Sequence, residues 1–276
     1  MPRLVILRVG SLLHRKPIKG NTTLNVSGYG LTKQDALINR TFGRLVHAPI
    51  ALTSQDFVLE SAAGTGTWLL ELVKQAPQTA QFVGIDIESH LFSNPTALPP
   101  NVSFRVQSVL NLPDEWTGKF TFWPQAFRGI FRALKPGGWL QLEENDNWAA
   151  GPVMDTFRSI MVKLGESRNI NLWPDVVPTL KGYLEECGFV DVRIDRRRTP
   201  IGPWGGRDGR DMKDNLLGLF RGIRAPVLAR GGFGIVNSEE MYDDMMNRAE
   251  FEMDSASGAA CWWVMICARK PGPKLV

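Results

Sequence analysis

One stretch of the chain constrains its fold more than any other. An apolar run ends in an acid, and a turn of small residues with two glycines follows, in Phe57-Val58-Leu59-Glu60-Ser61-Ala62-Ala63-Gly64-Thr65-Gly66-Thr67-Trp68. The next residues give a helix one apolar face, made by Leu69, Leu72, Val73 and Ala76. Glycines let a ligand approach the backbone, and a helix N-terminus offers unpaired N–H groups. The stretch therefore predicts a strand–turn–helix unit of an α/β fold, with a ligand site at the turn.

Two classes of cofactor use such a turn. The dinucleotide fingerprint places glycines at its first, third and sixth positions. This chain has Ala62, Gly64 and Thr67 there, so a nicotinamide oxidoreductase is the weaker alternative. The acid and the glycines from Glu60 to Gly66 instead resemble the first motif of class I S-adenosylmethionine (SAM)-dependent methyltransferases. Taken alone, the motif also fits a tight turn in some other α/β protein.

A second apolar strand supports a nucleoside site. Residues 81–88 end in acids, and Asp86 follows the glycine turn by about 20 residues. In doubly wound folds an acid at this spacing binds the ribose hydroxyls, and one carboxylate can accept two such hydrogen bonds. We therefore expect Asp86, with Ile87 beside it, at the ribose, rather than a merely solvated strand end.

Charge and composition indicate a globular protein without nucleic-acid or membrane partners. The net charge is +4, but the first 20 residues hold five basic and no acidic residues, so the remainder is close to neutral. A cluster of arginines at 193–198 is more commonly a solvated strand end than a binding patch. No apolar run approaches the ~20 residues that span a bilayer. Cys187, Cys261 and Cys267 lack metal spacing, which predicts reduced buried thiols, no metal site and a cytoplasmic location.

The domain is expected over residues 29–276, as a Rossmann-like, doubly wound, seven-stranded sheet. Residues 1–28 are predicted to be an irregular basic extension outside it, either disordered or a weak organellar transit peptide. Residues 261–268 are apolar on both faces, which predicts a buried last strand inserted antiparallel into the sheet. Two amphipathic helices within about 205–255 are predicted to form an inserted lid over the substrate.

Further motifs narrow the resemblance. They are Arg44-Leu45-Val46-His47-Ala48-Pro49-Ile50, Gly84-Ile85-Asp86-Ile87-Glu88, Leu112-Pro113-Asp114-Glu115-Trp116 and Leu134-Lys135-Pro136-Gly137-Gly138-Trp139. With the glycine turn, they resemble fungal LaeA-like and UMTA-like small-molecule methyltransferases linked to secondary metabolism. The resemblance implies SAM as cofactor, with its methionine end at the turn of Glu60, Ala62, Gly64 and Gly66. It places adenine near Ser108 and Val109, although many class I enzymes carry an acid at the position of Ser108.

One departure from the family concerns the fourth strand. The segment Lys119–Phe122 passes directly into Trp123-Pro124, so this strand is predicted to be shortened and its following loop deleted. An incorrect splice junction and decay to a non-enzyme give the same sequence. The prediction is methyl transfer from SAM to a small secondary-metabolite-like acceptor. The alternative is a catalytically impaired SAM-binding or regulatory protein.

The sequence also offers residues near the acceptor. Tyr29 and Arg40 are predicted lid residues, whereas His47 beside a proline is expected to be packed rather than catalytic. Glu143 and Glu144 follow a strand and are candidates to contact substrate or to act as a base, although such acids are usually solvated. Displacement at an activated methyl needs a base only when the acceptor must lose a proton, so no catalytic residue is assigned. The oligomeric state is not predicted.

Overall fold

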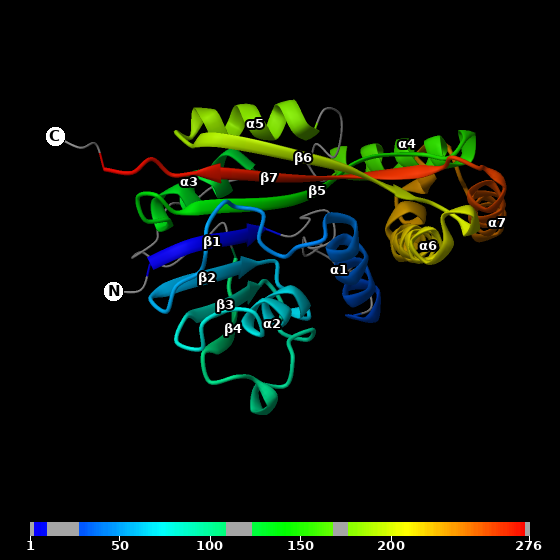
Figure 1. The fold of residues 1–276 in the computed structure, drawn as a ribbon. Helices are drawn as coiled ribbons and strands as arrows, with labels where there is room; N and C mark the ends of the chain where they lie inside the picture. The colour runs from blue at the N-terminus through cyan, green and yellow to red at the C-terminus, as the bar shows by residue number, and fades with distance from the viewer. Residues whose placement is uncertain (1–2, 10–27, 109–122, 168–175, 274–276) are drawn as a thin grey trace.

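The computed structural model describes residues 3–9, 28–108, 123–167 and 176–273. They form an α/β fold with a central sheet of order β4-β3-β2-β1-β5-β7-β6 (Figure 1). The strands are β1 (Arg3–Val9), β2 (Asp56–Ser61), β3 (Gln81–Asp86), β4 (Val102–Val106), β5 (Trp139–Ala149), β6 (Val190–Pro200) and β7 (Ala260–Arg269). Strand β7 runs antiparallel to both of its neighbours, β5 and β6, as the sequence predicts.

The placement of β1 corrects the prediction that residues 1–28 are irregular and lie outside the domain. Arg3–Val9 pairs in parallel with β2 on one side and β5 on the other. In the usual doubly wound order, 3-2-1-4-5-6, this place between the first and fifth strands belongs to the fourth. A central gap would leave the backbone N–H and C=O groups of β2 and β5 unpaired, which is costly in a buried sheet. The predicted short strand at Lys119–Phe122 lies outside the described residues.

Strand register divides the sheet into two parts. Val9 pairs with both Ser61 and Leu142, so β1 and β2 end at the same level. Strand β5 continues seven residues further, to Ala149, still paired with β7. Figure 1 shows this three-stranded extension of β5, β7 and β6 reaching away from β2–β4 toward α6 and α7.

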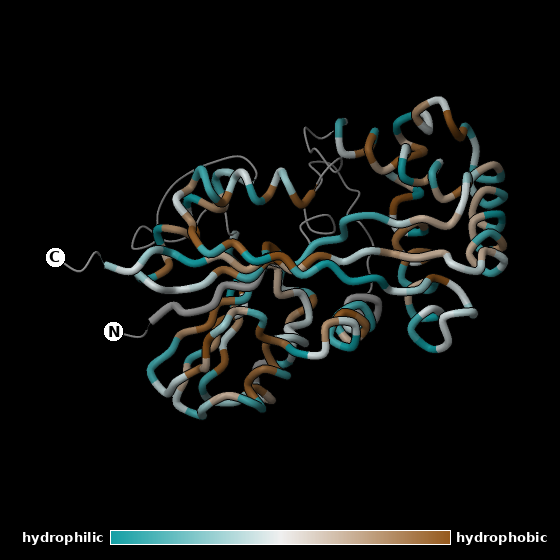
Figure 2. The backbone as a smooth tube through the Cα atoms, turned by 45° about the horizontal axis from the view of Figure 1, so that its top comes forward, coloured by the Kyte–Doolittle hydropathy of each residue, from teal (hydrophilic) through white to brown (hydrophobic). Residues whose placement is uncertain are grey.

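Helices cover both faces of the sheet. The helices are α1 (Gly28–Phe42), α2 (Thr67–Val73), α3 (Trp123–Ala133), α4 (Pro152–Glu166), α5 (Val176–Glu186), α6 (Gly206–Leu228) and α7 (Glu239–Ser255). Helices α3 and α5 pack on one face, against Leu140, Leu142, Val264 and Ile266. On the other face α2 covers β2–β4. Helices α1, α4, α6 and α7 share one apolar core with Trp139 and Trp263. Figure 2 shows apolar segments in β2–β4 and in the helices, whereas β6, at the edge of the sheet, is mostly hydrophilic.

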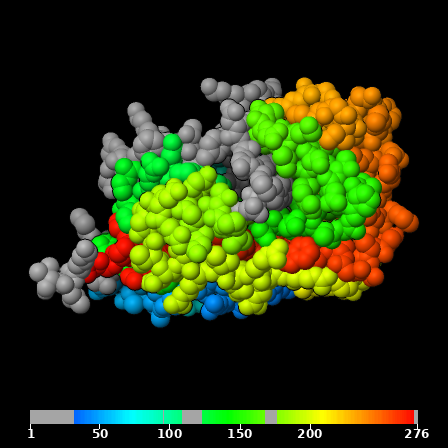
Figure 3. Space-filling model, turned by 90° about the horizontal axis from the view of Figure 1, so that it is seen from above, coloured from blue at the N-terminus to red at the C-terminus, as the bar shows by residue number. Residues whose placement is uncertain are grey.

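The segment near 205–255, predicted to be an inserted lid, contains α6 and α7, separated by a short 3-10 turn at Gly231–Gly234. Two further 3-10 turns lie at Pro95–Ala97 and Pro203–Gly205. Ser238 caps α7, because its hydroxyl accepts a hydrogen bond from Met241 N at 3.2 Å. From above, α5 and α4 occupy adjacent parts of the surface, and α7 lies at the end of the molecule (Figure 3).

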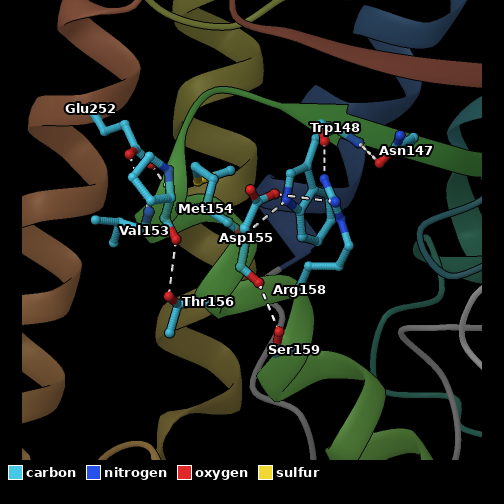
Figure 4. A network of polar contacts seen from close by, with 10 residues as sticks. Asn147, Trp148, Val153, Met154, Asp155, Thr156, Arg158, Ser159 and Glu252 are labelled. Atoms are coloured by element: carbon cyan, nitrogen blue, oxygen red, sulfur yellow. Dashed lines mark hydrogen bonds and ion pairs between the residues drawn. The ribbon is translucent and has the colours of Figure 1, made fainter.

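Glu252 of α7 fixes the start of α4, the helix that follows β5. Its carboxylate accepts hydrogen bonds from Val153 N at 3.1 Å and Met154 N at 2.8 Å (Figure 4). A carboxylate at a helix N-terminus satisfies unpaired donors and complements the helix dipole. Arg158 ties the same helix to β5 by donating a hydrogen bond to Trp148 O.

Candidate functional site

The glycine turn connects the end of β2 to α2 through three left-handed residues. Ala62, Gly64 and Gly66 have φ values of 57°, 53° and 72°. Positive φ is costly for a residue with a Cβ, so Ala62 is held there by its surroundings. One constraint is that Ala63 N donates to Ile85 O at 2.9 Å. The turn is therefore docked against the end of β3.

Asp86 joins the end of β3 to this turn. Its side chain is buried, with Oδ2 accepting a hydrogen bond from Gly64 N at 2.8 Å and Oδ1 accepting one from Ile87 N at 2.7 Å. A carboxylate oxygen accepts hydrogen bonds from backbone N–H groups and from hydroxyl groups alike, so the chemistry of Asp86 suits a ribose. The structure thus brings together Gly64, Asp86 and Ile87, as the sequence analysis expects.

The remaining predicted cofactor residues lie on the neighbouring strands. Glu60 is buried in β2, two residues before Ala62, and pairs with Gly84 across to β3. Ser108 follows β4 and is half-buried, with its carbonyl accepting from Gln107 Nε2 at 3.3 Å. Val109 lies outside the described residues. The described members of the set therefore occupy the carboxyl ends of β2, β3 and β4, where open α/β folds bind ligands.

Gly66 has a second role that the sequence pattern does not reveal. A Cβ at Gly66 would lie 2.1 Å from Phe104 Cζ, and one at Gly84 would lie 2.4 Å from the same ring. Phe104 of β4 therefore covers two glycines, one in the turn and one in β3. Part of the need for glycine at 66 is packing rather than ligand approach.

Helix α1 begins beside the glycine turn. The Thr32 hydroxyl lies 3.5 Å from Thr65 Oγ1 and 3.4 Å from Thr67 Oγ1. The side chain of Tyr29, a predicted lid residue, lies outside the described residues. Arg40, the other predicted lid residue, points to α6, where its Nε lies 2.8 Å from Asp208 Oδ1 and its Nη2 lies 2.5 Å from Asp211 Oδ2.

His47 is a packed residue, as predicted. It is buried, its ring packs edge-on against Phe42, and its backbone N donates to Gln141 Oε1 at 2.7 Å. Burial lowers the pKa of His47 from its ordinary value, so the neutral ring is favoured. Gln141, fully buried in β5, also donates to Leu45 O at 2.9 Å. This one amide fastens the segment after α1 to the sheet.

The two candidate acids on β5 point to opposite faces. Glu143 and Glu144 are both buried, contrary to the usual solvated position of acids after a strand. Because side chains alternate along a strand, Glu143 shares the face of Trp139 and Gln141, which α1 covers, and Glu144 shares the face of Leu142. Asn145, beyond them, donates to Trp262 O at 3.3 Å.

The three cysteines are free thiols, but Cys187, which was predicted to be buried, is half-buried. Cys261 and Cys267 are buried, and burial raises the pKa of Cys267 to about 12. Within the described part of the chain, no group of three or more His, Cys, Asp and Glu side chains could hold a metal ion. Nor does any described helix combine the length and apolar character needed to cross a membrane.

Comparison with known proteins identifies relatives of this chain. No family model matches the chain. N-methyltransferase tcpN of Claviceps purpurea is 29% identical over 244 residues, which are 78% of this chain and 84% of that protein. The chain is a homologue of fungal N-methyltransferases. The secondary metabolism regulator LAE1 of Cochliobolus heterostrophus is a further homologue, 25% identical over 68% of this chain and 67% of its own length.

Solved structures add a distant likeness. The phosphoethanolamine N-methyltransferase 2 of Haemonchus contortus, in complex with phosphomonomethylethanolamine and S-adenosylhomocysteine, is 15% identical to this methyltransferase homologue, with a TM-score of 0.47. The match covers 87% of this chain and about half, 52%, of that one. At that score the likeness supports no functional conclusion.

Several residues that shape the site belong to no recognisable sequence motif. Thr32 lies in a helix whose sequence carries no cofactor motif, and Phe104 reads as an ordinary apolar strand residue. Gln141 does carry a signal, since it is a polar residue inside the apolar strand Trp139-Leu140-Gln141-Leu142. A buried amide must find hydrogen-bond partners, so such a residue marks a segment docked on the sheet.

Proposed function

We propose that this chain is a SAM-dependent methyltransferase that acts on a small-molecule acceptor of the secondary-metabolite kind. The observation that carries the proposal is the bond from Gly64 N to the buried Asp86 carboxylate. It holds the glycine turn and the end of β3 as one unit at the carboxyl edge of the sheet. Homology to fungal N-methyltransferases supports the class of reaction.

The residues present fit SAM by their chemistry. Asp86 offers a carboxylate, a group that suits ribose hydroxyls, and the left-handed turn of Ala62, Gly64 and Gly66 has glycines at two of its three positive-φ positions, where a ligand can approach the backbone. Glu60, buried in β2 two residues before Ala62, stands at the methionine end of the cofactor in this assignment. Ser108, and by position Val109, stand near the adenine in this assignment. When bound, SAM supplies a methyl group already activated for direct displacement.

The chain's own contribution is alignment and exclusion of water. Helix α1 contacts the turn through the side chain of Thr32, and α6 packs against α1. Both helices therefore lie on the face of the sheet that carries Glu143. Holding reactants in line supplies much of the rate of a displacement that needs no covalent intermediate. Glu143 is the better placed of the two acids to contact an acceptor, because it faces α1.

The alternative of an impaired SAM-binding or regulatory protein rested on the apparent deletion of the loop after Phe122, next to a stretch that lies outside the described residues. In the sheet itself β1 occupies the place of the fourth strand. Homology to fungal N-methyltransferases favours the enzyme. Two relatives of the LaeA type are named as regulators, so a transfer experiment decides between the readings.

The experiment is methyl transfer from SAM carrying a tritiated methyl group to the small-molecule fraction of a fungal extract. We expect label in a small molecule with the wild type and with Asp56→Asn, and at least tenfold less with Asp86→Asn. Asp56 is a matched control, since it is buried and accepts a backbone hydrogen bond from Thr53 N, but at the opposite end of β2. Label in protein alone, or none, would contradict the proposal.

A further inference from the structure

Helix α1 touches the glycine turn at one end and the helical insertion along its length. At its beginning, the Thr32 hydroxyl lies within 3.5 Å of Thr65 and Thr67, which flank the left-handed Gly66. Thr65 and Thr67 are themselves 2.8 Å apart, so the three hydroxyls form one cluster. A ligand that orders the turn therefore acts directly on the position of α1.

The polar contacts of α1 with α6 follow one face of α6. Arg40 binds Asp208 and Asp211, at 2.8 and 2.5 Å. One turn further, Lys33 Nζ lies 3.7 Å from Asp214 Oδ2, and Asn215 Nδ2 donates to Gln34 Oε1 at 3.4 Å. Positions three and four apart share a helix face, so these carboxylates form a single acidic edge.

Apolar contacts reinforce the same pairing. Leu37 and Ile38 of α1 are buried in one core with Met212 and Leu216 of α6. Arg40 engages two carboxylates of α6, and its guanidinium forms a fork that fixes orientation as well as charge. A shift of α1 would therefore carry α6 with it.

A second ion-pair cluster on α6 provides an internal comparison. Lys213 Nζ lies 2.8 Å from Asp254 Oδ1 and 3.3 Å from Glu250 Oε1, both on α7. It resembles the Arg40 cluster in having one cation between two carboxylates. It differs in linking α6 to α7 and not to the cofactor turn.

We propose that α1 couples occupancy of the glycine turn to the position of the helical insertion, with Arg40 as the positioning residue that transmits the coupling to α6. This inference rests on the proposed function, because it takes S-adenosylhomocysteine (SAH) as the ligand of the turn. Coupling of this kind is reciprocal, so loosening α6 from α1 also weakens binding at the turn.

The test is hydrogen–deuterium exchange of the full chain with and without saturating SAH. In the wild type we expect SAH to slow exchange in α1 and in α6. In Arg40→Gln we expect slowed exchange in the first half of α1 but none in α6, and an SAH dissociation constant raised about fivefold or more. Lys213→Gln, the matched control, keeps the wild-type response of α6. Thermal melts confirm that both variants are folded, and Asp211→Asn repeats the test from the partner side.

The outcomes separate the two proposals. SAH binding with no change in α6, or equal protection of α6 in Arg40→Gln and the wild type, overturns the coupling while leaving the proposed function intact. Failure of the wild type to bind SAH contradicts the proposed function, and the coupling with it. Loss of α6 protection in Lys213→Gln to the same degree as in Arg40→Gln also overturns the role of Arg40, because any loosening of α6 would then suffice.

Discussion

At the scale of single residues, the site is organised by backbone donors that meet one carboxylate. Gly64 N and Ile87 N both donate to Asp86, which joins the turn to the end of β3. The sequence predicts Asp86 because its spacing from the glycines is a property of doubly wound folds. It does not predict the ring of Phe104 over Gly66, because contacts between strands depend on register rather than on local spacing.

Gly66→Ala tests the packing role of this glycine. A Cβ there meets a left-handed backbone and the ring of Phe104, so we expect a loss of about 2–4 kcal/mol in the free energy of unfolding. Gly137→Ala is the matched control, since Gly137 also has positive φ (81°) but nothing within 4 Å of the added Cβ. It should cost about 1–2 kcal/mol, the backbone strain alone. Equal losses in urea denaturation would contradict the packing role.

His47 predicts a pH dependence of stability. Burial lowers its folded-state pKa below the unfolded value of about 6.5, so the unfolded chain binds more protons between these two values. Stability therefore falls as the pH drops through that window, and it is fully present above it. We expect the melting temperature of His47→Gln to fall less than that of the wild type between pH 7.5 and pH 5. Equal losses of melting temperature in the wild type and in His47→Gln over this range would contradict the prediction.

At the scale of elements, the sequence does not predict the full strand order of the sheet. Residues 57–61, 81–86 and 102–106 are recognisable as strands from their apolar runs. Arg3–Val9 is also rich in apolar residues, but the basic residues around it and the lack of acids favour an irregular extension outside the domain. What places it in the sheet is the gap between β2 and β5, which is a property of the assembled sheet and not of the segment.

Removal of residues 1–10 tests that placement. Without β1, both β2 and β5 lose a hydrogen-bonded neighbour in the middle of the sheet, so we expect loss of the cooperative thermal transition. Removal of Pro271–Val276, which follow β7, serves as the control and should leave the transition in place. A truncated chain that melts like the wild type would show that β1 does not complete the sheet.

Glu252 gives a second prediction at this scale. Glu252→Ala leaves Val153 N and Met154 N at the start of α4 without their acceptor, which should cost about 1–2 kcal/mol in stability. Asp244→Ala removes an exposed carboxylate of α7, the helix that carries Glu252. Asp244 pairs with Arg248 at 3.8 Å, and its loss should cost less than about 0.5 kcal/mol. Chemical denaturation of both variants measures the difference, and similar values would argue against the cap.

At the scale of the whole molecule, the sheet has a half that carries the glycine turn and an extension. Strands β2–β4 carry the turn and Asp86, while β5, β7 and β6 continue toward α4, α6 and α7 (Figure 1). The sequence indicates both halves, through the glycine turn and through the apolar helices near 205–255. It does not indicate how α1 joins them, because Arg40 meets Asp208 and Asp211 only after the chain has folded.

The most direct test of a cofactor site at the glycine turn is a calorimetric titration with SAH. The purified wild-type chain, Asp86→Asn and Asp56→Asn are each titrated. We expect one binding site in the wild type, an unchanged dissociation constant in Asp56→Asn, and one raised at least tenfold in Asp86→Asn. Absence of binding to a folded wild type, or equal affinity in the two variants, would contradict a cofactor site built on the glycine turn and Asp86.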